Sequence, residues 1–133
     1  GFLEIWTDLH LAAPARVASA VISSPGVQAD WVLDNTVDAA GNIYAAGFTT
    51  GTLGALSRGQ GDAFIVRFDS NLQNPSYRQV GTARSDAFRK LEIDDNGNLF
   101  AVGYTYGDYG TPNADPSGLT GDVIVQRFDR QMG

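Results

Sequence analysis

The sequence predicts an all-β fold: two four-stranded antiparallel sheets preceded by a short N-terminal helix or arm. Composition is the first observation behind this prediction. The 133 residues include sixteen Gly and thirteen Asp but only two Glu and one Lys, which favours short strands and tight turns over helices. The second observation is an internal repeat of short apolar segments. Apolar residues make up 43% of the chain, so it can bury a core.

The internal repeat consists of two blocks that recur in the same order. Residues 28–51 match residues 84–107 at eight of 24 positions, with an offset of 56. Residues 61–69 match residues 121–129 at five of nine positions, with an offset of 60, because the loop between the blocks is four residues longer in the second copy. We therefore divide the chain into an N-terminal arm, repeat 1 and repeat 2: residues 1–24, 25–81 and 82–133.

The N-terminal arm does not follow the repeat. The apolar side chains of residues 2–13 share one helical face, and Pro14 would end that helix. Three residues of this face are expected to contact a partner: Phe2, Trp6 and Leu9. We interpret His10 as a polar helix residue or a partner contact rather than a general base. Residues 16–23 fit either a helix or a strand. Because they precede repeat 1 as residues 76–81 precede repeat 2, we expect a strand that completes the last sheet.

Each repeat is predicted to form consecutive antiparallel strands. The expected strands of repeats 1 and 2 are 31–38 and 87–94, 42–50 and 98–106, and 62–68 and 122–128, with a fourth at 76–81 in repeat 1 only. Ala40-Gly41 and Asn96-Gly97 predict two-residue hairpin turns with positive φ at both positions. The second strand has small residues on one face, which indicates close approach of a neighbouring sheet. The third strand is apolar on both faces, as in a strand covered on both sides.

Four short strands in about 56 residues, repeated, are typical of the blades of a β-propeller. Two blades cannot close a ring, since known propellers use about four to eight. Three arrangements stay open: a larger propeller with further blades of the same chain, several chains that complete one ring, or an open stack covered by partner proteins. Because isolated blades would expose large apolar faces, we expect other protein chains or further blades as partners.

The two copies resemble the SBBP-type β-propeller repeats. The pattern of that family is approximately D-x-x-G-N-x-Y-x-x-G-x-T, a glycine-rich loop, and G-D-A-F-x-x-x-[FY]-D. Repeat 1 contains both parts, at residues 38–49 and 61–69. Repeat 2 departs from the pattern at Phe100, where Tyr is usual, and at Val123 and Ile124, where Ala and Phe are usual. The resemblance implies a propeller-blade fold and a bacterial extracellular or cell-surface protein, with no shared catalytic residues to carry over.

Charge and composition argue against several classes of function. The formal charge is −6 and the nine Lys and Arg residues are scattered, so binding to nucleic acid is not expected. No stretch of about 18 apolar residues is present, so no membrane span is expected. The chain has no cysteine and one histidine, which leaves no thiolate nucleophile and no two-histidine metal motif. Since nucleophile motifs and paired Glu residues are also absent, we expect no enzyme activity, catalytic residues, cofactor or metal.

The recurring Asp residues are the first candidates for catalytic or metal-binding residues. Three pairs occupy equivalent places in the two repeats: Asp30 and Asp86, Asp62 and Asp122, and Asp69 and Asp129. Because a residue needed in every repeat serves the framework, we expect these carboxylates to accept hydrogen bonds at turns and strand ends. Residues 94–98 weakly resemble a calcium loop but lack the spacing and distal Glu of an EF-hand. We predict a hairpin turn there, and calcium binding is not indicated.

The 106–118 loop is where the two copies differ most, and it contains the inserted residues. Function concentrates in loops held by a rigid scaffold, so a ligand site is one interpretation of this loop. Five residues would form that site: Tyr106, Asp108, Tyr109, Asn113 and Asp115. The tyrosines would stack on a sugar ring, and the polar residues would bind hydroxyls or calcium. The alternatives are a protein contact and a solvated connector.

The leading hypothesis is a non-enzymatic extracellular or cell-surface scaffold or protein-interaction module. It would be a subunit of a larger surface assembly, a filament or a complete propeller. A framework-rich sequence without a catalytic constellation is the reason for this choice. The alternative is a carbohydrate-binding, lectin-like module that uses the 106–118 loop, and a glycosidase or lyase that uses the recurring Asp residues is third.

Overall fold

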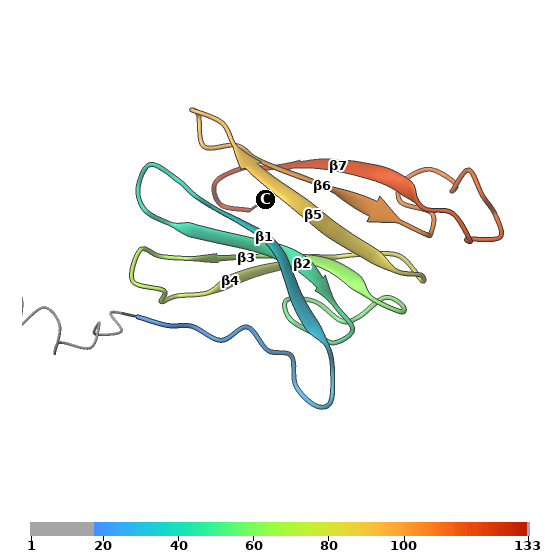
Figure 1. Ribbon diagram of the computed structural model, residues 1–133, viewed down its shortest axis with the longest axis horizontal. Coiled ribbons are helices and arrows are strands. Elements are labelled where there is room, and N and C mark those ends of the chain that lie inside the picture. The colour runs from blue at the N-terminus through green and yellow to red at the C-terminus, as the bar shows by residue number, and fades with distance from the viewer. Residues whose placement is uncertain (1–17, 133) are drawn as a thin grey trace, which may run out of the picture.

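Two antiparallel sheets form the fold in the computed structural model, which describes residues 18–132 (Figure 1). The first sheet contains, in spatial order, β1 (Asp30–Val37), β2 (Ile43–Thr49), β3 (Asp62–Phe68) and β4 (Ser76–Val80). The second sheet contains β5 (Asp86–Ile93), β6 (Leu99–Thr105) and β7 (Asp122–Phe128). The all-β prediction is confirmed. The helix predicted for residues 2–13, its expected partner contacts at Phe2, Trp6 and Leu9, and His10 lie outside the described residues.

The predicted strands of the two repeats are all present, with ends shifted by at most one residue. The strand predicted for residues 16–23 is not formed within one chain in its described part, because residues 18–23 belong to no strand. A strand exists only through pairing with a neighbour, and within residues 18–132 no strand pairs with this segment. The second sheet accordingly has three strands, whereas four were predicted, with the fourth supplied by residues 16–23.

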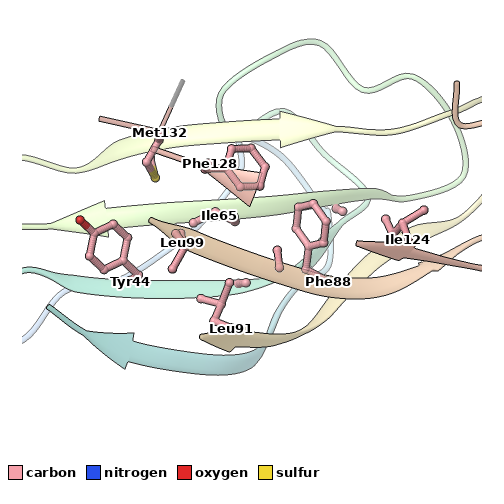
Figure 2. Close-up of a cluster of buried hydrophobic side chains, with 11 residues drawn as sticks. Tyr44, Ile65, Phe88, Leu91, Leu99, Ile124, Phe128 and Met132 are labelled. Carbon is pink, nitrogen blue, oxygen red and sulfur yellow. The ribbon is translucent and has the colours of Figure 1, made fainter. Parts of the chain in front are cut away.

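The two sheets pack face to face, and their facing sides form the main core (Figure 2). The first sheet contributes Tyr44, Ala46, Ala63 and Ile65, and the second sheet and its flanking turn contribute Phe88, Leu91, Leu99, Ala101, Ile124, Phe128 and Met132. Phe88 and Phe128 meet edge to face, with ring centroids 5.9 Å apart. A polar contact also joins the sheets, because the backbone N–H of Leu91 in β5 donates to Asp34 of β1 at 2.8 Å.

A β-bulge recurs in the first strand of each repeat, between Val32 and Asp34 and between Phe88 and Lys90. The bulge explains the small residue opposite it in the second strand. A Cβ atom on Gly103 would lie 1.8 Å from the carbonyl oxygen of Ala87. Gly47 occupies the equivalent place in repeat 1, where a Cβ would meet the neighbouring backbone at 1.7 Å. The close approach predicted from the small residues therefore comes from the adjacent strand and not from a neighbouring sheet.

The hairpin turns are wider than predicted. The N–H of Asp38 donates to the carbonyl of Asn42, and the N–H of Gly41 donates to the carbonyl of Asp38, both at 3.0 Å. Gly41 has a φ of +87°, whereas Ala40 does not have a positive φ. The loop therefore has three residues, with a left-handed residue in the last position. The Asp38 carboxylate stabilises this wider loop by accepting the N–H groups of Ala40 and Asn42.

The third strands of the two repeats differ in their environment. In β3 both faces are covered, as predicted, and four of its side chains from Ala63 to Val66 are fully buried. In β7 only one face lies in the core, and Val123 and Val125 on the other face are 75% and 68% exposed. The prediction is therefore wrong for β7, because no described layer covers the far side of the second sheet.

We expect Gly103→Ala to lower the free energy of unfolding by about 3 kcal/mol or more, because the new methyl group would overlap the fixed backbone of β5. Gly61→Ala is the matched control, since its nearest neighbours would lie 3.7 Å away and its effect should stay within about 1 kcal/mol. Urea unfolding followed by tryptophan fluorescence measures both. Equal losses in the two variants would contradict the role assigned to the bulge.

Candidate functional site

Five carboxylates serve the loops in which they stand, and two of them belong to the recurring pairs named above. Five Asp residues each open a loop of the same form: Asp38, Asp69, Asp94, Asp115 and Asp129. In every case the N–H two residues later donates to the carboxylate, and the N–H three residues later donates to the Asp carbonyl. The residue three positions on has a positive φ in all five loops. These carboxylates replace missing backbone partners, which is the framework role expected for recurring Asp residues.

The Asp residues at the first positions of β1 and β5 also accept hydrogen bonds. Asp30 accepts hydrogen bonds from the backbone and hydroxyl of Ser24 and from the hydroxyl of Thr49. Asp86 accepts the equivalent bonds from Thr82.

The first residues of β3 and β7 also engage neighbouring loops. Asp62 is fully buried and accepts the N–H of Arg58 at 2.9 Å and the side-chain amide of Gln79 at 2.8 Å. Asp122 accepts the N–H of Ala114 at 3.0 Å. In residues 18–132 no three acidic or imidazole side chains are grouped as a metal site would require. The geometry thus gives the carboxylates structural partners and shows no cluster that would hold a metal.

A cavity of about 580 Å³ lies beside the 106–118 loop, and we call it the loop cavity. Four of the five predicted ligand residues line it: Tyr106, Asp108, Asn113 and Asp115. The linker of residues 81–84 between the sheets forms another part of the wall, together with Arg58 from the β2–β3 loop. The fifth predicted residue, Tyr109, does not line the loop cavity. Its ring packs against the main core, and its hydroxyl hydrogen-bonds to Gln126.

The polar side chains that line the loop cavity differ in how far their hydrogen-bonding groups have partners. Asp115 accepts hydrogen bonds from both Ser117 and Thr120, which hold the pKa of its carboxyl well below the usual range. Asn113 is nine-tenths buried, and its side-chain oxygen accepts the N–H of Asp115. Its side-chain nitrogen is also buried and has no hydrogen-bond partner among the described residues. A donor of this kind costs free energy unless a ligand or water accepts from it.

Two arginines line the loop cavity, where their charges are matched by those of Asp108 and Asp115. Arg58 comes from the β2–β3 loop, and Arg84 comes from the linker between the sheets. The Arg84 guanidinium donates to the carbonyl of Ser117 at 3.0 Å and so fixes the 106–118 loop against the linker. Sequence analysis missed both arginines, because they are distant from this loop along the chain and no motif marks them. Only the packing of repeat 1 against repeat 2 brings them to one place.

A second cavity, of about 420 Å³, lies among the loops that follow β1, β5 and β7. Asp38, Asp94, Tyr44, Arg67 and Arg130 are among its lining residues. The Tyr44 hydroxyl donates to Asp38 at 3.2 Å, and burial raises the pKa of this phenol while the nearby Arg67 opposes the shift. Both Asp carboxylates already accept hydrogen bonds from their own hairpin loops. The arrangement therefore stabilises the turns and does not pair a nucleophile with a free base.

No protein-family model matches this chain, and no curated protein is significantly similar to it. The resemblance to SBBP-type repeats therefore stays a prediction. The described part of the chain contains no helix that is long and apolar enough to cross a membrane.

The loop carboxylates predict how stability depends on pH. Burial alone would raise the pKa of Asp30 and Asp38, but their hydrogen bonds outweigh it and lower the pKa. Hydrogen bonds from Asn98 lower the pKa of Asp94, and those from Ser117 do the same at Asp115. A lowered folded-state pKa stabilises the fold above the unfolded value of about 3.9, and this stabilisation is lost as the pH falls through the folded value.

We therefore expect the urea midpoint to be nearly constant from about pH 7 to 5 and to fall below about pH 4. Asp94→Asn is the matched variant, since its amide oxygen still accepts the N–H groups of Asn96 and Asn98 but does not titrate. Its midpoint should fall less steeply in acid than that of the unmodified chain. A midpoint that rises on acidification would contradict this account.

Proposed function

We propose that this chain is a non-enzymatic scaffold or protein-interaction module of an extracellular or cell-surface assembly, which packs onto further sheets of its own kind. The observation that carries the proposal is an uncovered apolar surface on the side of the second sheet that faces away from the first. We call it the outer face. Its apolar residues are Phe100, Val102, Tyr104, Val123 and Val125. Charged residues share it, because Arg89 lies over the Tyr104 ring at 5.2 Å. Glu92 and Arg127 also flank Phe100 on the neighbouring strands. Cross-strand pairing places Val102 beside Val125 and Tyr104 beside Val123.

The repeat shows what the outer face lacks. Equivalent positions in the first and second sheets are Ala46 and Val102, Ala63 and Val123, and Ile65 and Val125. In the first sheet all three residues are fully buried against the second sheet. In the second sheet the three valines are 38%, 75% and 68% exposed. The surface that carries the main core in repeat 1 therefore faces solvent in repeat 2, and a further sheet of the same kind fits it.

The far side of the first sheet is covered over β2 and β3 but open at β1. Val32 of β1 is 48% exposed, although its equivalent in β5, Phe88, is fully buried between the sheets. Each sheet thus has one face for the sheet that follows and another for the sheet that precedes. Such an interface is heterologous, so it leads to a ring or to an open filament. Burial of a valine side chain contributes about 1.5–3 kcal/mol, which favours association through uncovered faces.

We expect the chain to associate in a concentration-dependent manner, and Val125→Lys to shift it towards the monomer, because a charged residue on the outer face opposes burial. Leu119→Lys is the matched control, since Leu119 is 84% exposed in the β6–β7 loop and should leave association unchanged. Light scattering during gel filtration gives the mass of each species. A chain that remains a monomer of 14.1 kDa at every concentration would contradict the proposal.

A second candidate function is carbohydrate binding, and one specific observation favours it. The loop cavity joins four residues that were expected to bind a sugar with two arginines and with the unpartnered amide nitrogen of Asn113. An amide donor and guanidinium groups suit a saccharide that has hydroxyl and carboxylate groups. We propose acidic saccharides as the preferred class for this candidate site.

Tyr106→Ala should weaken the binding of an acidic oligosaccharide by about tenfold if its ring stacks on a sugar. Arg58→Ala should weaken it in a salt-dependent way, because the lost contact is charged. Arg127→Ala, on the exposed part of β7 and outside the cavity, serves as the control. Calorimetric titration with a polygalacturonate fragment, with and without calcium, measures these effects. Absence of binding, or equal losses in all three variants, would remove the carbohydrate candidate.

A further inference from the structure

We propose that residues 18–22 of one copy of this chain pair, as an antiparallel strand, with the free edge of β7 in a second copy. This inference rests on the proposed function, because it names the partner and the contact that join neighbouring sheets. Its first basis is a hydrogen-bond pattern that recurs ahead of both repeats. The N–H of Ser24 donates to Asp30 at 2.7 Å, and the N–H of Thr82 donates to Asp86 at 2.6 Å. The hydroxyls of Ser24 and Thr82 donate to the same carboxylates.

The segment ahead of Ser24 therefore corresponds to the segment ahead of Thr82, which is β4. Packing supports the equivalence. Val80, two residues before Thr82, packs against the core formed with the second sheet. Ile22, two residues before Ser24, packs against the second apolar cluster of the molecule, on the far side of the first sheet. That cluster contains Ala45, Phe64, Val66 and Phe68. Ile22 thus packs against the first sheet as Val80 packs against the core shared with the second sheet, and residues 18–21 are exposed.

The two equivalent segments differ in pairing. β4 pairs with β3 over Ser76–Val80, whereas residues 18–22 pair with no strand in the described part of the chain. The equivalent of β3 in repeat 2 is β7, which pairs with β6 on one side and with no described strand on the other. Residues 18–22 and the free edge of β7 therefore correspond to β4 and β3, which pair with each other in the first sheet. An exposed edge of this kind presents backbone donors and acceptors to another strand.

The partner is a second copy because the two halves lie on opposite sides of one molecule. In Figure 1 the blue segment ahead of β1 runs beside the first sheet, and β7 lies at the far side of the second sheet. A strand supplied by a second copy would bring that copy's first sheet towards the outer face. Backbone pairing and apolar packing would then form one continuous contact.

The β3–β4 pairing also predicts the register. Ala63 lies opposite Val80, and Ile65 lies opposite Arg78. Transfer to the equivalent positions places Val123 opposite Ile22 and Val125 opposite Ala20. Residues 18–22 contain no charged residue and no proline, so every backbone N–H can donate in this register.

Disulfide cross-linking tests this register directly, because the chain contains no cysteine. The double variant Ala20→Cys with Val125→Cys should form covalent dimers and longer oligomers on oxidation, seen on a non-reducing gel. Ala20→Cys with Val123→Cys is the matched control, shifted by two residues along the strand. Opposed positions have Cα atoms within disulfide range and shifted positions do not, so the control should give about tenfold less product. Equal yields from the two variants would overturn the register.

A second variant separates this inference from the proposed function. Ala20→Pro removes one backbone donor from the exposed segment and should reduce association without changing the unfolding midpoint of the monomer. If Val125→Lys weakens association while Ala20→Pro has no effect and the Ala20–Val125 pair does not cross-link, strand pairing is wrong and packing through the outer face stands. A chain that never associates overturns both.

Discussion

Both faces of the sheets in this protein carry apolar side chains, and most of the architecture depends on the need to cover them. The first sheet is covered on one side by the second sheet and on the other by Ile22, Leu53, Leu72 and Tyr77. Residues 18–132 cover the second sheet on one side only. The hydrophobic effect makes the same side chains stabilising when a layer lies over them and a driving force for association when none does. The proposed function follows from this difference between two nearly equivalent sheets.

Local hydrogen bonds at the loops and a bulge in the first strand give each sheet its form. A carboxylate at the start of a loop accepts backbone N–H groups that would otherwise lack partners, and five loops use it. A bulge in the first strand of each repeat requires the glycine opposite it. Because both devices recur in both repeats, the same sequence signals give the two sheets the same form. They also account for five of the thirteen Asp residues and for Gly47 and Gly103 without reference to catalysis.

The same hydrogen bonds limit the acid–base chemistry of these loop carboxylates. A carboxylate held by several backbone donors has a lowered pKa, and it is a poor general acid or base at neutral pH. The loop cavity differs from the turns, because it combines two arginines with a buried donor that has no protein partner. Its composition suits recognition of a polar ligand rather than bond cleavage. A scaffold and a carbohydrate-binding module are compatible uses of one such fold.

The all-β class, the repeat and the ends of the seven strands, to within one residue, could be predicted from the sequence. The reason is that alternation and turn residues act locally. Four of the five residues expected at a ligand site line one cavity, since they stand in one loop. The positions of Arg58 and Arg84 beside that loop, and of the Tyr109 ring against the core, depend on the tertiary structure. So does the exposure of Val123 and Val125, whose equivalents in the first sheet, Ala63 and Ile65, are buried. These outcomes depend on which layers meet across the fold. The same apolar pattern in a strand is compatible with a covered face and with an open one, so it could not decide between them.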